Sequence, residues 1–97
     1  MAADTAKAWR VSAADGAEAV VAAMRALPRT EGVQHNGCRA LEDLAHRDAA
    51  NQAAIARAGG IEAVVAAMRA LPRAEKVQQH GCAALRNLAA SRAAHQA

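Results

Sequence analysis

The chain of 97 residues is almost without aromatic side chains: it has one tryptophan, no tyrosine and no phenylalanine. Threonine is scarce as well, so the residues that favour β-strands are few. Alanine, which has the highest helix propensity, makes up most of the hydrophobic fraction of 54%. The composition therefore predicts an all-α fold. Its helices must pack closely, because alanine side chains bury little area.

Long apolar runs are also missing. No stretch of about 18 apolar residues occurs, which argues against a membrane-spanning helix. The first ten residues, MAADTAKAWR, lack the apolar centre of a signal peptide. We therefore expect a cytoplasmic location, with the nucleus as the alternative.

The charge of the chain is modest and spread out. The net charge is +3, and no aromatic residue that could stack on a base lies among the arginines. No segment combines bulky apolar residues with a lysine-rich face, as membrane-surface helices do. We expect neither nucleic-acid binding nor membrane binding.

One apolar segment, in contrast, is present twice. EAVVAAMRALPR runs from Glu18 to Arg29 and returns unchanged from Glu62 to Arg73. At this offset of 44, residues 6–53 and 50–97 are identical at 28 of 48 positions. Such a period is typical of helical solenoids, in which each unit buries its apolar face against its neighbours. We interpret residues 1–97 as a single module with unit one at about 4–47, unit two at about 48–91, and the start of a third unit at 92–97.

Proline and glycine mark the helix ends within each unit. Pro28 and Pro72 close the segments that start after Gly16 and Gly60, because proline cannot continue a helix. The predicted helices cover residues 4–14 (a weak one), 17–27, 30–45, 48–58, 61–71 and 74–89.

The apolar residues within these segments follow helical spacing. Val20, Val21, Met24 and Leu27 recur three and four residues apart, as do their copies in unit two. Glycine recurs inside the third helix of each unit, at 37 and 81, at a cost of about 1 kcal/mol in helix propensity. This recurrence predicts a close crossing by a neighbouring helix. One stripe of the third helix in unit two holds Val77, Gly81, Cys82, Leu85 and Leu88.

The two cysteines occupy equivalent positions of the two units. Equivalent positions on packed helices lie about 10 Å apart, which is too far for a disulfide. We therefore predict that Cys38 and Cys82 are reduced thiols buried as small apolar core residues.

With its order of helices, the sequence resembles an armadillo repeat. The resemblance rests on NQAAIARAGGIEAVVAAMRALPRAEKVQQHGCAALRNLAAS, from Asn51 to Ser91, and extends in diverged form over nearly the whole chain. It joins a short helix, Gly-Gly-Ile, a second helix closed by proline, and a long third helix ending in ALRNLA. A helical repeat of the HEAT type is the alternative, and the Gly59-Gly60-Ile61 junction argues against it. The resemblance implies a right-handed α-solenoid of about two three-helix repeats.

The resemblance also implies a function. Armadillo arrays are protein- or peptide-binding scaffolds without enzymatic activity, and their third helices line a concave groove that holds an extended peptide. An asparagine near the end of that helix hydrogen-bonds the peptide backbone, and Asn87 occupies this place. Unit one has Asp43 instead. Peptide-binding members often add a tryptophan one turn earlier, where this chain has Arg39 and Ala83, so a basic nuclear-localisation peptide is not the expected ligand.

Helical spacing gives the residues that would face this groove. For any one of them the alternative is an ordinary solvated face. Because arginines and carboxylates alternate there, we expect a charge-bearing extended peptide as the ligand. The predicted binding residues are His35, Arg39, Glu42, Asp43, Gln79, Arg86 and Asn87.

The residues give no support to other chemistry. His35 and Cys38 could meet one metal ion, but His80 and Cys82 point to different sides of their helix, and a zinc site needs three or four ligands. The hydroxyl residues lack a recognisable base, and no phosphate-binding loop is present. We expect no enzymatic activity, no metal and no cofactor.

The alternative function is self-assembly. About three repeats are normally needed for a stable solenoid, and this chain has two. We therefore expect apolar surface without an intrachain cover at both ends, and a homo-oligomer, most simply a dimer that joins equivalent ends around a two-fold axis. Head-to-tail stacking is the other possibility. The predicted interface residues are Val77, Cys82, Leu85, Leu88, Val11 and Met24.

Overall fold

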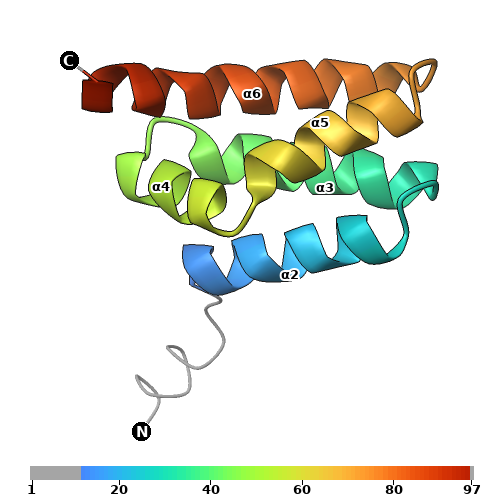
Figure 1. Ribbon diagram of the computed structural model, residues 1–97, viewed down its shortest axis with the longest axis horizontal. Coiled ribbons are helices and arrows are strands. Elements are labelled where there is room, and N and C mark those ends of the chain that lie inside the picture. Colours follow the sequence, from blue (N-terminus) through green and yellow to red (C-terminus); the bar gives the residue numbers. More distant parts are fainter. Residues whose placement is uncertain (1–11, 97) are drawn as a thin grey trace, which may run out of the picture.

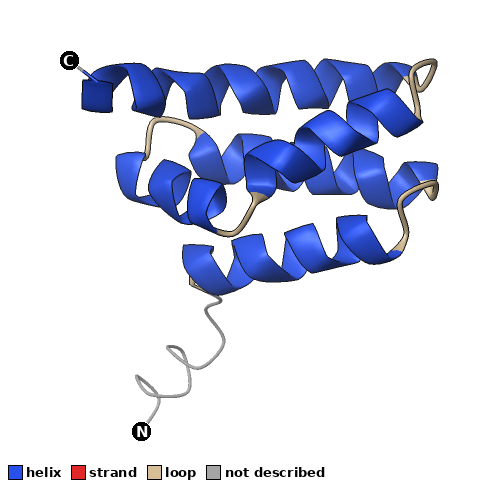
Figure 2. Ribbon diagram, viewed as in Figure 1, coloured by secondary structure: helices blue, strands red, loops and turns tan. Residues whose placement is uncertain are grey.

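The computed structural model describes residues 12–96, and in that range every regular element is a helix. The helices are α2 (Ala13–Ala26), α3 (Glu31–Ala45), α4 (Ala49–Arg57), α5 (Gly60–Ala70) and α6 (Glu75–Gln96). Figure 1 shows α3 and α5 between α2 at one side and α6 at the other, with the short α4 at one end. Within the described residues no strand occurs (Figure 2), so the all-α prediction is confirmed at this level.

The two units follow the repeat. Helices α2 and α3 form an antiparallel pair, and α5 and α6 form its copy 44 residues later, with α4 between the pairs. Both second helices end two residues before a proline, at Ala26 and Ala70, as expected. The helix expected over 4–14 lies mostly outside the described residues, and so do Val11 and Trp9.

Two expected boundaries differ. Helix α2 begins at Ala13, not after Gly16, because the side chain of Ser12 accepts a hydrogen bond from the Asp15 amide at 3.0 Å and caps it there. In unit two the break stays at Gly59, whose φ of 86° is left-handed. Helix α6 runs without interruption to Gln96, so residue 92 is not a helix start.

Glutamine side chains cap the ends of both second helices. Gln34 Nε2 donates to the carbonyls of Met24 and Leu27, both at 2.9 Å. Its copy Gln78 donates in the same way to the carbonyls of Met68 and Leu71, at 2.9 and 3.0 Å. These carbonyls have no partner inside their own helix. The repeated Val-Gln pair therefore ties each third helix to the second helix before it.

Amide side chains also cap α3. Asn51 Nδ2 donates to the Leu44 carbonyl at 2.8 Å, and Gln52 Nε2 donates to the Ala45 carbonyl at 2.6 Å. Both come from α4, and the turn between the helices passes through Arg47, whose φ is 54°. The end of α3 is thus held by the unit that follows it.

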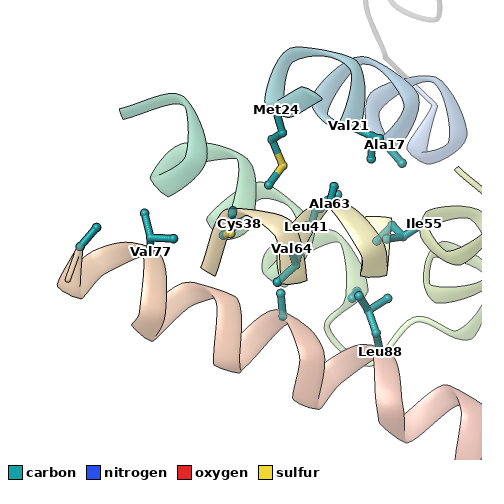
Figure 3. Close-up of a cluster of buried hydrophobic side chains, with 14 residues drawn as sticks. Ala17, Val21, Met24, Cys38, Leu41, Ile55, Ala63, Val64, Val77 and Leu88 are labelled. Atoms are coloured by element: carbon teal, nitrogen blue, oxygen red, sulfur yellow. The ribbon is translucent and has the colours of Figure 1, made fainter. Parts of the chain in front are cut away.

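A single core runs through both units. Figure 3 shows Val21 and Met24 reaching into it from α2, and Val77 and Leu88 reaching into it from α6. The fully buried side chains of Cys38, Leu41, Ile55, Val64 and Val77 lie at its centre. The close crossing at the helix glycines is confirmed: a Cβ placed on Gly37 or Gly81 would lie 2.6 Å from a methionine sulfur.

Burial corrects part of the cysteine and interface predictions. Cys38 is buried, but Cys82 is exposed, so its predicted core position is wrong. Conversely, Val77, Leu88 and Met24 are each 3% exposed or less, so these three do have an intrachain cover. Leu85 is half-buried. Cys82 lies on the outer side of α6, where none of the described helices packs, whereas its copy Cys38 lies on the side of α3 that the second unit covers.

No helix within the described part of the chain combines the length and the apolar character that crossing a membrane requires.

Candidate binding face on helices α3 and α6

Helices α3 and α6 lie side by side and make the most extensive contact between any two helices (Figure 1). Residues on one side of this contact join the two units. The rings of His35 and His80 stack, with centroids 5.1 Å apart and planes 22° apart. His80 Nδ1 lies 2.7 Å from a carboxylate oxygen of Glu42. We call this side the α3–α6 face. It is defined by the predicted binding residues and His80: His35, Arg39, Glu42, Asp43, Gln79, His80, Arg86 and Asn87.

Asn87 occupies the same face with a structural role of its own. Its Nδ2 donates a hydrogen bond of 2.9 Å to the backbone carbonyl of Glu42. That carbonyl is in the last turn of α3 and has no intrahelical partner. Asn87 therefore caps the first unit's third helix from the second unit's third helix. Its amide oxygen and its second N–H remain for a ligand.

The remaining predicted residues flank this bridge. Arg39 lies between His35 and Glu42 on the helical stripe of α3 and is exposed. Asp43 is also exposed. On α6, Gln79 and Arg86 are exposed, and each directly precedes a residue that contacts α3: Gln79 precedes His80, and Arg86 precedes Asn87. Among residues 12–90 the one ion pair is His80 with Glu42, so these two arginines have no carboxylate within 4.0 Å.

A pocket lies at one end of the face. It has a volume of about 310 Å³ and is lined by His35 together with the starts of α3 and α6. Both signs of charge surround it, because carboxylates and basic side chains come from each side. The other lining residues are Glu31, Gly32, Arg73, Ala74, Glu75 and Lys76.

The reactivity of the Cys38 thiol, which lies on α3 next to Glu42, is lowered by burial. Burial raises the pKa of the Cys38 thiol from the ordinary value of 9.0 to about 11, and the carboxylate of Glu42 adds to the rise. Cys38 is therefore neutral at physiological pH and a poor nucleophile. Among the described residues, no hydroxyl or thiol is hydrogen-bonded to His80, and no group of three metal-ligating side chains gathers.

Three predicted residues take part in contacts between the units: His35 stacks on His80, and Glu42 contacts both His80 and Asn87. His80, which joins them, was missed as a site residue. Its counterpart in unit one is Asn36, so the repeat gave no signal for it. The seven-residue spacing of His80 and Asn87 on one helix could have indicated it.

Comparison with models of protein families, with curated proteins and with solved structures gives no match for this chain.

Proposed function

We propose that the chain is a non-enzymatic binding module of the armadillo-like type, whose α3–α6 face holds an extended segment of a partner protein. Three features support this: the resemblance of Asn51–Ser91 to an armadillo repeat, the all-α repeated arrangement, and the contacts of Glu42 on one third helix with His80 and Asn87 on the other. A cytoplasmic location fits the two free thiols.

The exposed arginines carry the proposal. Arg39 and Arg86 come from different units, both are exposed, and neither has a carboxylate partner among the described residues. A guanidinium group presents donors in a fixed fork that suits carboxylates and backbone carbonyls. The bridge of His80, Glu42 and Asn87 fixes the distance between the two helices that present these arginines. The expected ligand is an extended peptide with acidic residues opposite the arginines and a basic residue opposite Asp43.

The test is peptide selection followed by affinity measurement. A library of random 12-residue peptides is selected against the immobilised chain, and binders are measured by fluorescence anisotropy. Loss of one charge-assisted hydrogen bond costs about 1.5–3 kcal/mol, which is at least a ten-fold loss of affinity. We expect this loss for Arg39→Ala and for Arg86→Ala, and a further decline at high salt.

The matched control is Arg69→Ala, which removes an exposed arginine from α5, outside the α3–α6 face. This variant should bind like the wild-type chain. Selected peptides whose affinity is the same in all three variants would place the site elsewhere. A selection that enriches no sequence would contradict the peptide-binding proposal itself.

A further inference from the structure

The duplicated segment is an internal control, because identical residues in identical helices differ in exposure. On one side of the second helix, Val64 is 0% and Ala67 is 2% exposed in unit two. Their copies in unit one are uncovered: Val20 is half-buried and Ala23 is exposed. The local sequence is the same, so the difference comes from the neighbour. Unit two has unit one beside it, and unit one has no element of residues 12–96 on that side.

The opposite side of the same helix shows the reverse. In unit one Val21 is 2% and Met24 is 3% exposed. Their copies in unit two, Val65 and Met68, are only half-buried. Here unit one has a neighbour in unit two, and unit two has none within residues 12–96. Each unit therefore lacks cover on the side on which the other unit is covered.

The third helices repeat this relation. Val77 is fully buried on the inner side of α6, whereas its copy Val33 is half-buried. Cys38 is fully buried on the inner side of α3, whereas its copy Cys82 is exposed. We call the uncovered side of unit one the leading face and the uncovered side of unit two the trailing face. The leading face comprises Ala19, Val20, Ala23, Thr30 and Val33, and the trailing face comprises Val65, Met68, Cys82, Leu85 and Ala89.

The leading face is hollow as well as apolar. A depression of about 470 Å³ lies on it between α2 and α3. It is the position that, in unit two, the first unit fills. Its lining is Val20, Ala23, Thr30, Gly32, Val33, Asn36 and Gly37.

The junction inside the chain shows what covers each face. There, the inner side of unit two packs on the inner side of unit one: Met24 lies with Ala63 and Ala67 around one small pocket, and Cys38, Val64 and Val77 share the core (Figure 3). The inner side of unit two is the copy of the leading face. The inner side of unit one is the copy of the trailing face. The chain thus carries, at its two ends, two surfaces whose copies are already complementary in its interior.

We propose that the leading face binds the trailing face of a second copy of this chain, so that copies join head to tail and continue the internal repeat. The two-fold dimer expected from the sequence would instead place like faces together, an arrangement with no precedent inside the chain. A contact between unlike faces leaves both outer ends open and so allows further copies to add.

Charges at the new junction agree with this pairing. Inside the chain, the Asn87 side chain contacts the Glu42 backbone. In the contact between two copies, each of these residues is replaced by its counterpart 44 residues away. Asp43 of the second copy takes the place of Asn87, and Arg86 of the first copy takes the place of Glu42. Unlike the Asn87 amide, the Asp43 carboxylate cannot donate to the backbone carbonyl of Arg86, but its charge is opposite to that of the Arg86 side chain, which favours this register over ones that bring like charges together.

The test uses one blocking variant for each face, Ala23→Glu for the leading face and Cys82→Glu for the trailing face. Both residues are exposed, so the single chain should fold, which circular dichroism checks. Ala19→Glu is the second leading-face variant, because Ala19 is exposed while its copy Ala63 is 4% exposed. The matched control is Ala56→Glu, at an exposed position on α4 outside both faces. Sedimentation velocity is measured over a concentration series with a reductant present, so that no disulfide through Cys82 contributes.

Head-to-tail pairing gives a distinctive result. The wild-type chain and the control should pass beyond the dimer as concentration rises, and each blocking variant alone should stay at the monomer mass of 10.0 kDa. An equimolar mixture of the two blocking variants should form a heterodimer of about twice that mass and nothing larger, because each supplies the face that the other lacks.

Two other outcomes overturn the proposal. Two-fold pairing would let one blocking variant still dimerise alone, and the mixture would form no heterodimer. A wild-type chain that stays monomeric at all concentrations would mean that the two faces do not bind each other.

Discussion

The glutamine caps lead to a sharp prediction, because the two copies are equal in sequence and unequal in burial. Gln34 is 1% exposed, and Gln78, at the same place in unit two, is half-buried. Methionine has a similar length but cannot donate a hydrogen bond. Gln34→Met and Gln78→Met therefore each remove a donor from two helix-end carbonyls. The carbonyl of Met24 or Met68 loses the side-chain donor that satisfies it, whereas that of Leu27 or Leu71 still accepts from the backbone N–H of Thr30 or Ala74.

The structure gives the size of each effect. The Met24 carbonyl belongs to a buried residue, so losing its donor should cost about 1–3 kcal/mol, whereas the residue that carries the second carbonyl, Leu27, is 50% exposed, and water can replace that bond for about 1 kcal/mol. Gln34→Met should thus lower the free energy of unfolding by about 2–4 kcal/mol. Gln78→Met should lower it by about 1–2 kcal/mol, because Met68 and Leu71, which carry the two carbonyls, are half-buried rather than buried.

Urea unfolding followed by circular dichroism measures both values. The control is Gln79→Met, because Gln79 is exposed and makes no hydrogen bond with another described residue; its effect should stay below about 0.5 kcal/mol. The reasoning is refuted if Gln34→Met is as harmless as the control, or if Gln78→Met costs more than Gln34→Met.

Three further predictions concern single positions. Gly37→Ala should destabilise the fold by about 1 kcal/mol, because the new methyl group displaces the buried side chain of Met24. Gly81→Ala should be close to neutral, because the half-buried side chain of Met68 can move and alanine favours the helix. Equal effects of the two substitutions in thermal unfolding would contradict this. In native protein Cys82 should react quickly with a thiol reagent and Cys38 slowly, and rapid native labelling of Cys38 would overturn its burial. The free energy of unfolding should fall between pH 9.0 and about 11, because in this range the Cys38 thiol ionises in the unfolded chain but stays protonated in the folded one. The Cys38→Ala variant should lack this part of the decline. Asn87→Ala should lower stability by about 1 kcal/mol without any ligand, and an unchanged urea midpoint would mean that the cap on α3 is dispensable.

The repeat made much of the fold predictable. The offset of 44 and the prolines gave the ends of α2 and α5, and helix α4 at Ala49–Arg57 lies within one residue of its predicted range at both ends. These features follow from local rules, because proline and the glycine pair act on their own helix. The predicted start of α2 was wrong because of another local rule. Unit one has Asp15 where unit two has Gly59, so no glycine pair breaks the helix there, and the Ser12 cap, three residues earlier, sets the boundary.

Features that depend on the neighbouring unit were not predictable from the repeat. Cys38 and Cys82 are the same residue in the same motif, yet only one is buried, because only one has a unit packed over it. The pairing of His80 with Glu42 spans 38 residues and occurs once, so no internal copy pointed to it. Likewise, the repetition of Gln34 at Gln78 did not show what either side chain contacts.

The central claim, that the α3–α6 face binds an extended peptide, is tested most directly by nuclear magnetic resonance. The amide spectrum of the ¹⁵N-labelled chain is recorded during titration with a peptide from the selection, using the Ala23→Glu chain so that self-association does not contribute. The account predicts that the largest shifts follow the exposed side of both third helices, at Arg39, Asp43, Arg86 and Asn87. Shifts confined to α2 and α5, or spread evenly over all helices, would contradict it.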